Sequence, residues 1–254
     1  QRDRAAVAAN SPIDMLPIIQ IGPAVVQVPG LVLLLGVWIA LSLVEREAAR
    51  LRLSPLVVYN AVLFGLAAGI GGARLAHVLR FPAAYLASPI SLIALTPDTL
   101  DPLGGLLVAA AVTVGYGWRR GLPLWPGLDA LAPGLAAFAI FLGIAHLASG
   151  QAFGAPTDLP WGIRLWNETR HPSQAYEIAA AAGILLAIWR KQMPATGLTF
   201  LLFVALTAAA RLFLEAFRGN SVLLAGGVRA AQAGSLAALL IALWGMRVRF
   251  SQKI

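Results

Sequence analysis

Seven apolar stretches constrain what this chain can fold into more than any other feature. Each approaches the roughly 20 residues that a helix needs to cross the hydrocarbon of a bilayer. Because a segment in lipid must satisfy its own backbone hydrogen bonds, such stretches predict helices. They lie near residues 23–44, 56–79, 103–118, 124–149, 173–189, 196–217 and 223–246. The expected fold is an all-α integral membrane protein with about seven transmembrane helices and a small outward-facing head segment.

The composition agrees with a membrane protein and excludes several kinds of site. Of the 254 residues, 59% are hydrophobic and 12% are charged, against about 25% charged residues in a soluble domain. The net charge is +8, but no polar domain carries it, so we expect no nucleic-acid partner. The chain has three histidines and no cysteine, which excludes disulfides and cysteine nucleophiles and argues against structural zinc. We expect no cofactor.

The basic residues predict the orientation in the membrane, because Lys and Arg are retained on the cytoplasmic side. Ten of them fall in one set of loops and seven in the other, and the loops of the first set are shorter. We therefore expect the amino terminus outside and the carboxyl terminus in the cytoplasm. The predicted segments are an outer segment 1–22, a membrane domain 23–246 with outer loops 80–102 and 150–172, and a cytoplasmic tail 247–254.

Two arginines interrupt the apolar stretches. Arg74 and Arg211 would each cost at least ~2.5 kcal/mol at bilayer depth unless paired or in a wet cavity, so each is a candidate site residue. Arg211, Glu215 and Arg218 follow an i, i+4, i+7 spacing and are expected on one helical face. A structural pairing of Arg211 with Glu215 explains that spacing equally well. The glycines of GIGGAR, just before Arg74, are expected to let helices pack closely.

The stretch RHPSQAYE places polar side chains at the mouth of an apolar helix. Pro172 suits the first turn of a helix, which puts Gln174 and Glu177 on one face. Such residues are either anchors at the water interface, as Tyr176 often is, or parts of a site. An arginine in an outward-opening cavity suits a phosphate, because its planar fork gives bidentate hydrogen bonds. A phospholipid headgroup is the phosphate available at that depth.

Taken in order, the motifs of this chain resemble those of the bacterial prolipoprotein diacylglyceryl transferase family. RHPSQAYE is similar to the family's HPSQ-x-YE signature, and ARLFLEAFRGN to its Arg-x-x-x-Glu-x-x-Arg helix. GGARLAHVLRFPAAYLASP, PLGGLL, PGLDALAPGLA and GAPTDLPWGI resemble further family segments, and Gln232 falls at its last-helix glutamine. The resemblance runs from about residue 23 to residue 246.

The resemblance implies an activity and a set of residues. The family moves the diacylglyceryl group of phosphatidylglycerol to the lipobox cysteine of a preprolipoprotein in the bacterial plasma (inner) membrane. By this resemblance Arg211 is the phosphate-binding, electrophilic arginine and Glu215 orients it. The implied lipid-binding residues are Arg74, Arg218, Gly104, Gly105, Gly154, His171, Gln174, Tyr176, Glu177 and Gln232.

The sequence differs from the family pattern in more than one segment. The family's Gly-Arg-x-Gly-Asn-Phe-x-Asn-Gly pattern corresponds to LGIAHLASG, where Gly143 replaces the arginine, and His146 and Ser149 replace the two asparagines. Leu103 stands where the family has a histidine before a glycine pair. His146 has two interpretations: a catalytic base that takes over proton handling, or an interfacial, hydrogen-bonded residue.

Three functions are therefore weighed. The first is an active transferase of diacylglyceryl groups. The second is a catalytically degenerate relative that serves as a structural or lipid-binding subunit of a larger membrane complex, since an arginine, a histidine and an asparagine are lost. The third is a small transporter or channel, suggested only by the buried arginines and disfavoured because no paired internal repeat is present.

Overall fold

The computed structural model describes residues 18–21, 24–87, 99–165, 167–191, 193–224 and 226–251. Most of the predicted outer segment 1–22, residues 88–98 of outer loop 80–102 and the last three residues of the tail lie outside this set. The chain divides into two compact units, and each is described by itself. Unit 1 is Gln1–Leu43 with Leu131–Ile254, and unit 2 is Val44–Ala130.

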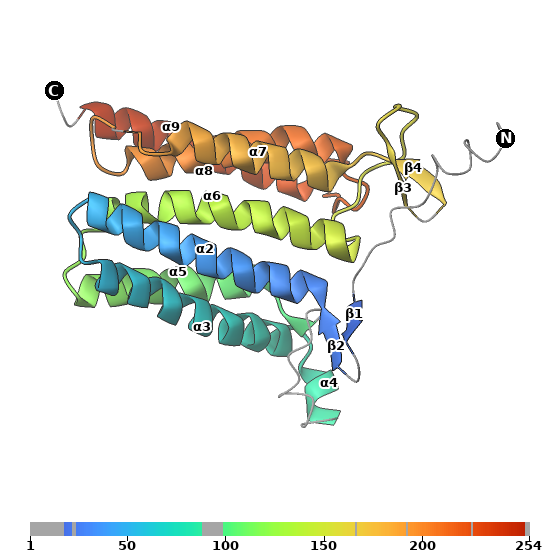
Figure 1. Cartoon of the computed structure of the whole chain (residues 1–254), viewed down its shortest axis with the longest axis horizontal. Coiled ribbons are helices and arrows are strands. Elements are labelled where there is room, and N and C mark those ends of the chain that lie inside the picture. Colours follow the sequence, from blue (N-terminus) through green and yellow to red (C-terminus); the bar gives the residue numbers. More distant parts are fainter. Residues whose placement is uncertain are drawn as a thin grey trace. The chain divides into compact units, whose positions relative to one another are not determined.

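Each of the seven predicted apolar stretches contains a long helix. Within the described residues these helices are α2 (Val28–Arg50), α3 (Pro55–Arg80), α5 (Pro102–Arg119), α6 (Leu124–Ser149), α7 (Ser173–Ile188), α8 (Leu198–Leu214) and α9 (Ala230–Ser251) (Figure 1). A short helix, α4 (Pro82–Ala87), follows α3, and one 3₁₀ turn, η3 (Glu215–Phe217), follows α8. The predicted positions of the helices are confirmed to within a few residues, except for α2 and α9, which begin and end five to seven residues later than predicted.

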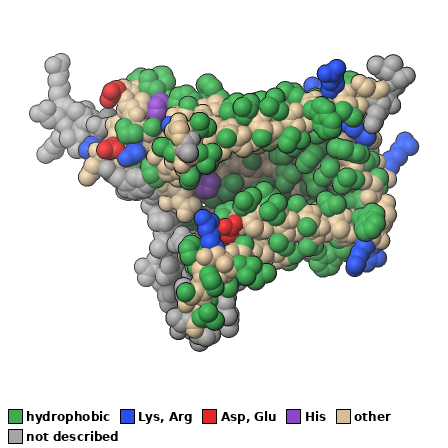
Figure 2. Space-filling view, turned by 180° about the vertical axis from the view of Figure 1, so that it is seen from behind, with side chains coloured by type: hydrophobic (Ala, Val, Ile, Leu, Met, Phe, Trp, Pro, Cys, Tyr) green, Lys and Arg blue, Asp and Glu red, His purple; other side chains and the backbone are tan. Residues whose placement is uncertain are grey.

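The surfaces of the helices are those of a membrane-spanning protein. In the described part of the chain, five helical segments are long and apolar enough to cross a bilayer: α2, α3, α6, α8 with η3, and α9; α7 is apolar but shorter. Large apolar side chains such as Trp38, Leu79 and Leu186 are exposed, which a surface in water rarely tolerates over a large area. On the face drawn in Figure 2, hydrophobic side chains cover the helices of each unit, and Lys and Arg gather toward the helix ends.

Short hairpins add to the predicted helical fold. Strands β1 (Ile18–Ile21) and β2 (Ala24–Gln27) pair antiparallel, so α2 begins at Val28 instead of residue 23. Strands β3 (Ile163–Leu165) and β4 (Glu168–Arg170) form a second antiparallel pair before α7. Helix α9 begins at Ala230 instead of residue 223, because a hydrogen-bonded loop precedes it.

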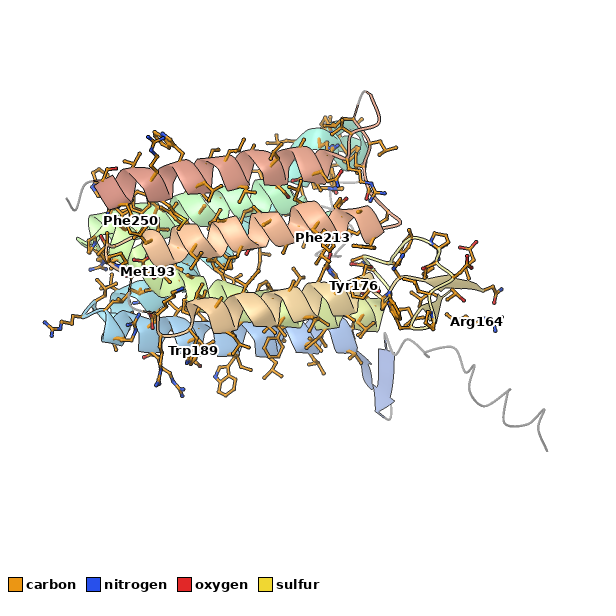
Figure 3. All side chains as sticks on the ribbon, turned by 90° about the horizontal axis from the view of Figure 1, so that it is seen from above. Arg164, Tyr176, Trp189, Met193, Phe213 and Phe250 are labelled. Carbon is orange, nitrogen blue, oxygen red and sulfur yellow. The ribbon has the colours of Figure 1, made fainter. Side chains whose placement is uncertain are left out.

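Helices α6, α7 and α8 share the core of unit 1. The buried residues Ala132 and Ala136 of α6 pack with Ile184 and Ile188 of α7, and the apolar side chains of α8 complete this cluster. Small alanines on α6 let the two helices lie close together. Helix α9 packs along α8, as Figure 1 also shows. In Figure 3, Tyr176 and Phe213 lie toward one end of these helices, and Trp189, Met193 and Phe250 lie toward the other.

Glycines join α3 and α5 in unit 2. A Cβ atom on Gly105 would lie 2.8 Å from the Cβ of Ala73, closer than packed side chains approach. Gly69 and Gly72 are equally crowded by α5, whereas Gly71 has open space around it. The prediction that glycines near Arg74 permit close helix packing is therefore confirmed for Gly69 and Gly72, and it is wrong for Gly71.

Candidate functional site

The segment RHPSQAYE lies where the β3–β4 hairpin meets helix α7. The helix begins at Ser173, one residue after Pro172, and the Ser173 hydroxyl donates a hydrogen bond of 2.6 Å to the carbonyl oxygen of Ala152. This start places Gln174 and Glu177 one turn apart on the same face, as predicted. We call the described residues of 150–172 the head segment, and in Figure 3 its Arg164 lies beyond the Tyr176 end of α7.

Glu177 connects two arginines from the far end of helix α8. Its Oε1 accepts hydrogen bonds from Arg211 Nη1 at 2.9 Å and from Arg218 Nη1 at 2.5 Å. Arg211 Nη2 also lies 3.0 Å from Glu215 Oε2. The structural pairing of Arg211 with Glu215 is thus observed, and Glu177 adds a link between α7 and α8. We call Glu177, Arg211, Glu215 and Arg218 the ion-pair cluster.

The members of the ion-pair cluster differ in their access to a ligand. The side chains of Glu215 and Arg218 are 2% and 11% exposed, and that of Glu177 is 19% exposed. Arg211 is 36% exposed. Glu215 Oε2 contacts Arg211 as an ion pair without the alignment of a hydrogen bond. Arg211 is therefore paired with two carboxylates. It is also the more exposed of the two arginines in the cluster, so it is the one that an incoming anion can reach more easily.

Arg211, Glu215 and Arg218 were predicted to share one face of a helix, but only Arg211 lies within α8. Helix α8 ends at Leu214, and the tighter turn η3 carries the chain from Glu215 to Arg218. Arg218 has an extended backbone, with φ of −81° and ψ of 140°. The side chain of Arg218 therefore reaches Glu177 on α7, and its carboxylate partner is not Glu215.

Gly154 lies where the head segment contacts the turn after α8. Gly154 and Arg218 form an isolated β-bridge, and the amide of Gly219 donates to the carbonyl of Phe153 at 3.0 Å. A Cβ atom on Gly154 would lie 2.1 Å from the carbonyl oxygen of His171. Because that contact is with backbone, only glycine fits here. The backbone of the head segment is thereby held against the backbone of Arg218, one of the two arginines of the ion-pair cluster.

His171 and Tyr176 belong to a set of aromatic rings beside the cluster. The ring centroids of His171 and Phe217 are 5.1 Å apart, and those of Tyr176 and Phe217 are 5.9 Å apart. The Tyr176 hydroxyl accepts a hydrogen bond of 2.9 Å from Trp161 Nε1. These contacts hold the head segment against η3.

Gln174 and His146 are polar groups inside unit 1. Gln174 is fully buried; its Nε2 donates to the carbonyl of Gln151 at 2.8 Å, and its Oε1 has no hydrogen-bond partner among the described residues. His146, near the end of α6, has a buried Nδ1 that also lacks a partner within the described part of the chain. The charges of Glu177, Arg211 and Arg218 act on the imidazole of His146.

Gly143 occupies the position that the family resemblance assigns to an arginine. A Cβ atom there would lie 2.6 Å from Cγ1 of Ile178 on α7. Helices α6 and α7 therefore pack where a longer side chain would begin. A side chain at this position would require the side chain of Ile178 to move.

The link into α9 brings in Gln232 and an arginine that sequence reasoning missed. Gln232 Nε2 donates to the carbonyl of Leu212 at 3.3 Å, so it ties α9 to α8. Arg229 Nη1 donates to the main-chain carbonyls of Glu215 and Arg218. In the sequence Arg229 counted only toward loop charge, although its position three residues before Gln232 was a usable signal.

The remaining predicted lipid-binding residues belong to unit 2. Arg74 is buried, donates to the carbonyl of Thr99 at 3.1 Å, and lies with its guanidinium carbon 5.0 Å from the ring centre of Tyr85. Gly104 and Gly105 lie in the contact between α3 and α5. Each of these residues thus has a packing or hydrogen-bonding role within its own unit.

The ion-pair cluster presents a partly exposed guanidinium group, that of Arg211, to an incoming ligand. Among the described residues, no group of three His, Asp or Glu side chains is arranged to hold a metal ion. Guanidinium groups fixed by carboxylates bind phosphate through charge-assisted hydrogen bonds. The arrangement can therefore bind a phosphate ester and stabilise negative charge that develops on its oxygen atoms.

Comparison with known proteins agrees with this chemistry. A family model described as prolipoprotein diacylglyceryl transferase matches residues 17–248. Relatives named phosphatidylglycerol–prolipoprotein diacylglyceryl transferase occur in several bacteria. One from Geobacter sulfurreducens is 35% identical over 205 residues, which cover 74% of this chain and 76% of the relative. One from Solidesulfovibrio magneticus is 33% identical over 181 residues, covering 67% and 68%. One from Synechococcus elongatus is 26% identical over 247 residues, covering 90% and 85%.

Proposed function

Because the chain belongs to the prolipoprotein diacylglyceryl transferase family, we propose that it transfers a diacylglyceryl group from phosphatidylglycerol to a prolipoprotein cysteine. The observation that carries this proposal is the ion-pair cluster, in which Arg211 is partly exposed while Glu177 and Glu215 hold it. An arginine held in this way is prepared to bind a phosphate without reorganising. The acceptor is the lipobox of a preprolipoprotein.

The proposed reaction is a displacement at carbon. The cysteine sulfur attacks the glycerol carbon that bears the phosphate, a carbon–sulfur bond forms, and the carbon–oxygen bond to phosphate breaks. Glycerol phosphate leaves with the electron pair of that bond, and the thiol proton passes to a base. Arg211 would bind the phosphate and stabilise the departing charge. Arg218, which shares Glu177 with Arg211, would add a second positive charge near the phosphate.

His146 is our candidate for the base. A thiol must lose its proton to become a good nucleophile. The two carboxylates of the cluster are already paired with arginines, whereas Nδ1 of His146 has no partner among the described residues. A neutral imidazole in reach of the thiol is a suitable proton acceptor.

The remaining residues would shape the site. Gly154 and the aromatic pair of His171 and Tyr176 would hold the head segment beside the lipid headgroup. Gln174 would offer its side-chain oxygen, which has no partner among the described residues, and Gln232 would hold α9 against α8. For Arg74, Gly104 and Gly105 the proposal rests on the family resemblance alone.

We place the site at the outer surface of the bacterial inner membrane. In unit 1 the cluster lies at the beginning of α7 and the end of α8, whereas Arg190, Lys191, Arg247 and Arg249 follow the end of α7 or lie in the last turns of α9. Those basic residues mark the cytoplasmic side. The carboxyl terminus would then be cytoplasmic, the amino terminus outside, and the seven helices would span the membrane.

A second candidate function is supported by Gly143. The close packing of Gly143 against Ile178 leaves the cluster without the arginine that the family resemblance places there. Loss of a charged partner from a desolvated anion site costs several kcal/mol, and about 1.4 kcal/mol is already a tenfold change in rate. A degenerate member would keep the lipid site and serve as a subunit of a larger membrane complex.

Transfer by the purified protein separates the two candidates. The full chain in nanodiscs that contain phosphatidylglycerol is mixed with a lipobox peptide, and the lipidated peptide is measured by mass spectrometry. We expect transfer by the unaltered chain, and a loss of at least about a hundredfold in Arg211→Lys and Glu177→Gln, because each removes part of a partly buried charged network. Arg164→Gln, at an exposed position in the head, should keep its activity. A folded chain that gives no product while an active family member does would favour the degenerate subunit.

A further inference from the structure

Arg229 lies at the base of a tight loop between η3 and α9. Leu223 and Arg229 form a β-bridge, and the amide of Ala230 donates to the carbonyl of Val222 at 2.9 Å. The tip contains Gly226 and Gly227, with φ of +83° and +78°, which is the left-handed region that favours glycine. The loop therefore returns the chain to its starting point and places Arg229 beside the turn that carries Glu215 and Arg218.

The charge of the ion-pair cluster shows why this arginine matters. Two arginines and two glutamates make the cluster formally neutral. A neutral cluster can donate guanidinium hydrogen bonds to a phosphodiester, but it does not balance the single negative charge of that ligand. Arg229 contacts the main chain of Glu215 and Arg218 without meeting either carboxylate within the described residues. With Arg229 the site has a net charge of +1, which balances the single negative charge of a phosphodiester.

Arg229 also has donors to spare. Of its five N–H groups, only those of Nη1 are engaged by described residues, and they donate to two carbonyl oxygens. Its Nε and Nη2 groups have no hydrogen-bond partner in the described part of the chain. The hydroxyl of Ser221, on the same loop, is buried and likewise has no partner among the described residues. An anion that approaches the ion-pair cluster could therefore accept hydrogen bonds from these donors of Arg229 and Ser221.

We propose that Arg229 is a further phosphate-binding residue of this site, supplying the cationic group that Gly143 does not. The proposal rests on the proposed function for the position of the lipid, and its ligand is the phosphate ester shared by phosphatidylglycerol and glycerol phosphate. The carbonyls of Glu215 and Arg218 orient the guanidinium. Its Nε and Nη2 groups bind the phosphate oxygens.

Ligand binding by the purified full chain in detergent tests the proposal. The ligands are short-chain phosphatidylglycerol, glycerol 1-phosphate and short-chain diacylglycerol, which has no phosphate. The variants are Arg229→Gln, Arg229→Lys and the charge-matched control Arg164→Gln. In Arg229→Gln we expect Kd for both phosphate ligands to rise about tenfold or more, the loss expected for one charge-assisted hydrogen bond. Diacylglycerol binding should change less than about twofold. Arg229→Lys should fall between, because it keeps the charge without the planar fork.

Three results would overturn the proposal. The first is unchanged phosphate binding in Arg229→Gln. The second is an equal loss for all three ligands, which indicates that Arg229 only stabilises the turn. Weaker binding of phosphatidylglycerol with unchanged binding of glycerol 1-phosphate would locate the effect in the lipid and also count against it. Thermal unfolding of each variant separates misfolding from lost binding. A chain that shows the expected binding pattern but no transfer to peptide would refute the proposed function and leave this inference standing.

Discussion

Glu177 is the residue through which the site is assembled. One of its oxygen atoms accepts hydrogen bonds from both Arg211 and Arg218, so a carboxylate of α7 sets the distance between two arginines that leave the end of α8. The sequence placed Glu177 in the HPSQ-x-YE signature. It contained no indication that Glu177, rather than Glu215, pairs with Arg218, because that pairing depends on a 3₁₀ turn that helical spacing does not anticipate.

Gly154 offers a test at a single residue. A methyl group there would meet the carbonyl oxygen of His171 at 2.1 Å, so we expect Gly154→Ala to destabilise the protein by about 1–3 kcal/mol, as overpacking does. The measurement is thermal unfolding in detergent.

Gly183→Ala is the matched control, because nothing lies within 4 Å of the position and alanine favours a helix. It should leave the melting temperature unchanged or raise it. Equal stability of both variants would contradict the close contact at Gly154.

At the scale of the element, helices α3 and α5 depend on glycine for their contact. In Gly105→Ala the new methyl would lie 2.8 Å from the Cβ of Ala73 and 2.9 Å from the carbonyl oxygen of Gly69. We expect a loss of about 1–3 kcal/mol, visible as a lower melting temperature. Gly115→Ala, on the same helix with open space around it, should have little effect, and a similar loss in both variants would show that the helices are not held by this contact.

The start of α5 predicts a dependence on pH. The Asp101 carboxylate accepts the amide hydrogen of Gly104 at 2.8 Å, which lowers its pKa, and nearby Arg80 adds to the effect. A lowered pKa in the folded state stabilises the protein above the ordinary value of about 4, and this contribution disappears as pH falls through the lowered pKa. Asp101→Ala should therefore melt below the unaltered chain at pH 7. The gap should close in acid, and a gap of constant size down to pH about 2 would contradict the assignment.

At the scale of the whole molecule, apolar length predicted the helices well. The stretch 124–149 agrees with α6, and 173–189 with α7, within one residue. The starts of α2 and α9 were placed too early, because Ala24–Gln27 and the loop ahead of Ala230 are as apolar as the helices that follow them. Apolar composition does not separate a hairpin from the first turns of a helix, and turn glycines such as Gly226 were the available signal.

The site was predictable in parts. The residue types of RHPSQAYE and of the Arg211 helix indicated a phosphate site, since polar groups in apolar stretches must have partners. The hydrogen bonds of Arg229 with Glu215 and Arg218 were not predictable, because they depend on the path of the loop before α9, although the position of Arg229 near Gln232 was a usable signal. The contact of Gly143 with Ile178 was not predictable, because it depends on how α6 and α7 meet. The family resemblance named the missing arginine, and the structure adds that Ile178 of α7 packs against the glycine in its place.

Maturation of lipoproteins in living cells tests the central claim most directly. Bacteria depleted of their own diacylglyceryl transferase are supplied with this chain or with its Arg211→Ala variant, and prolipoprotein maturation is followed by the mobility shift of a labelled lipoprotein. We predict rescue by the chain and no rescue by the variant at equal membrane levels. Absence of rescue by the unaltered chain, when it is inserted as well as an active control, would contradict a transferase and indicate the degenerate subunit.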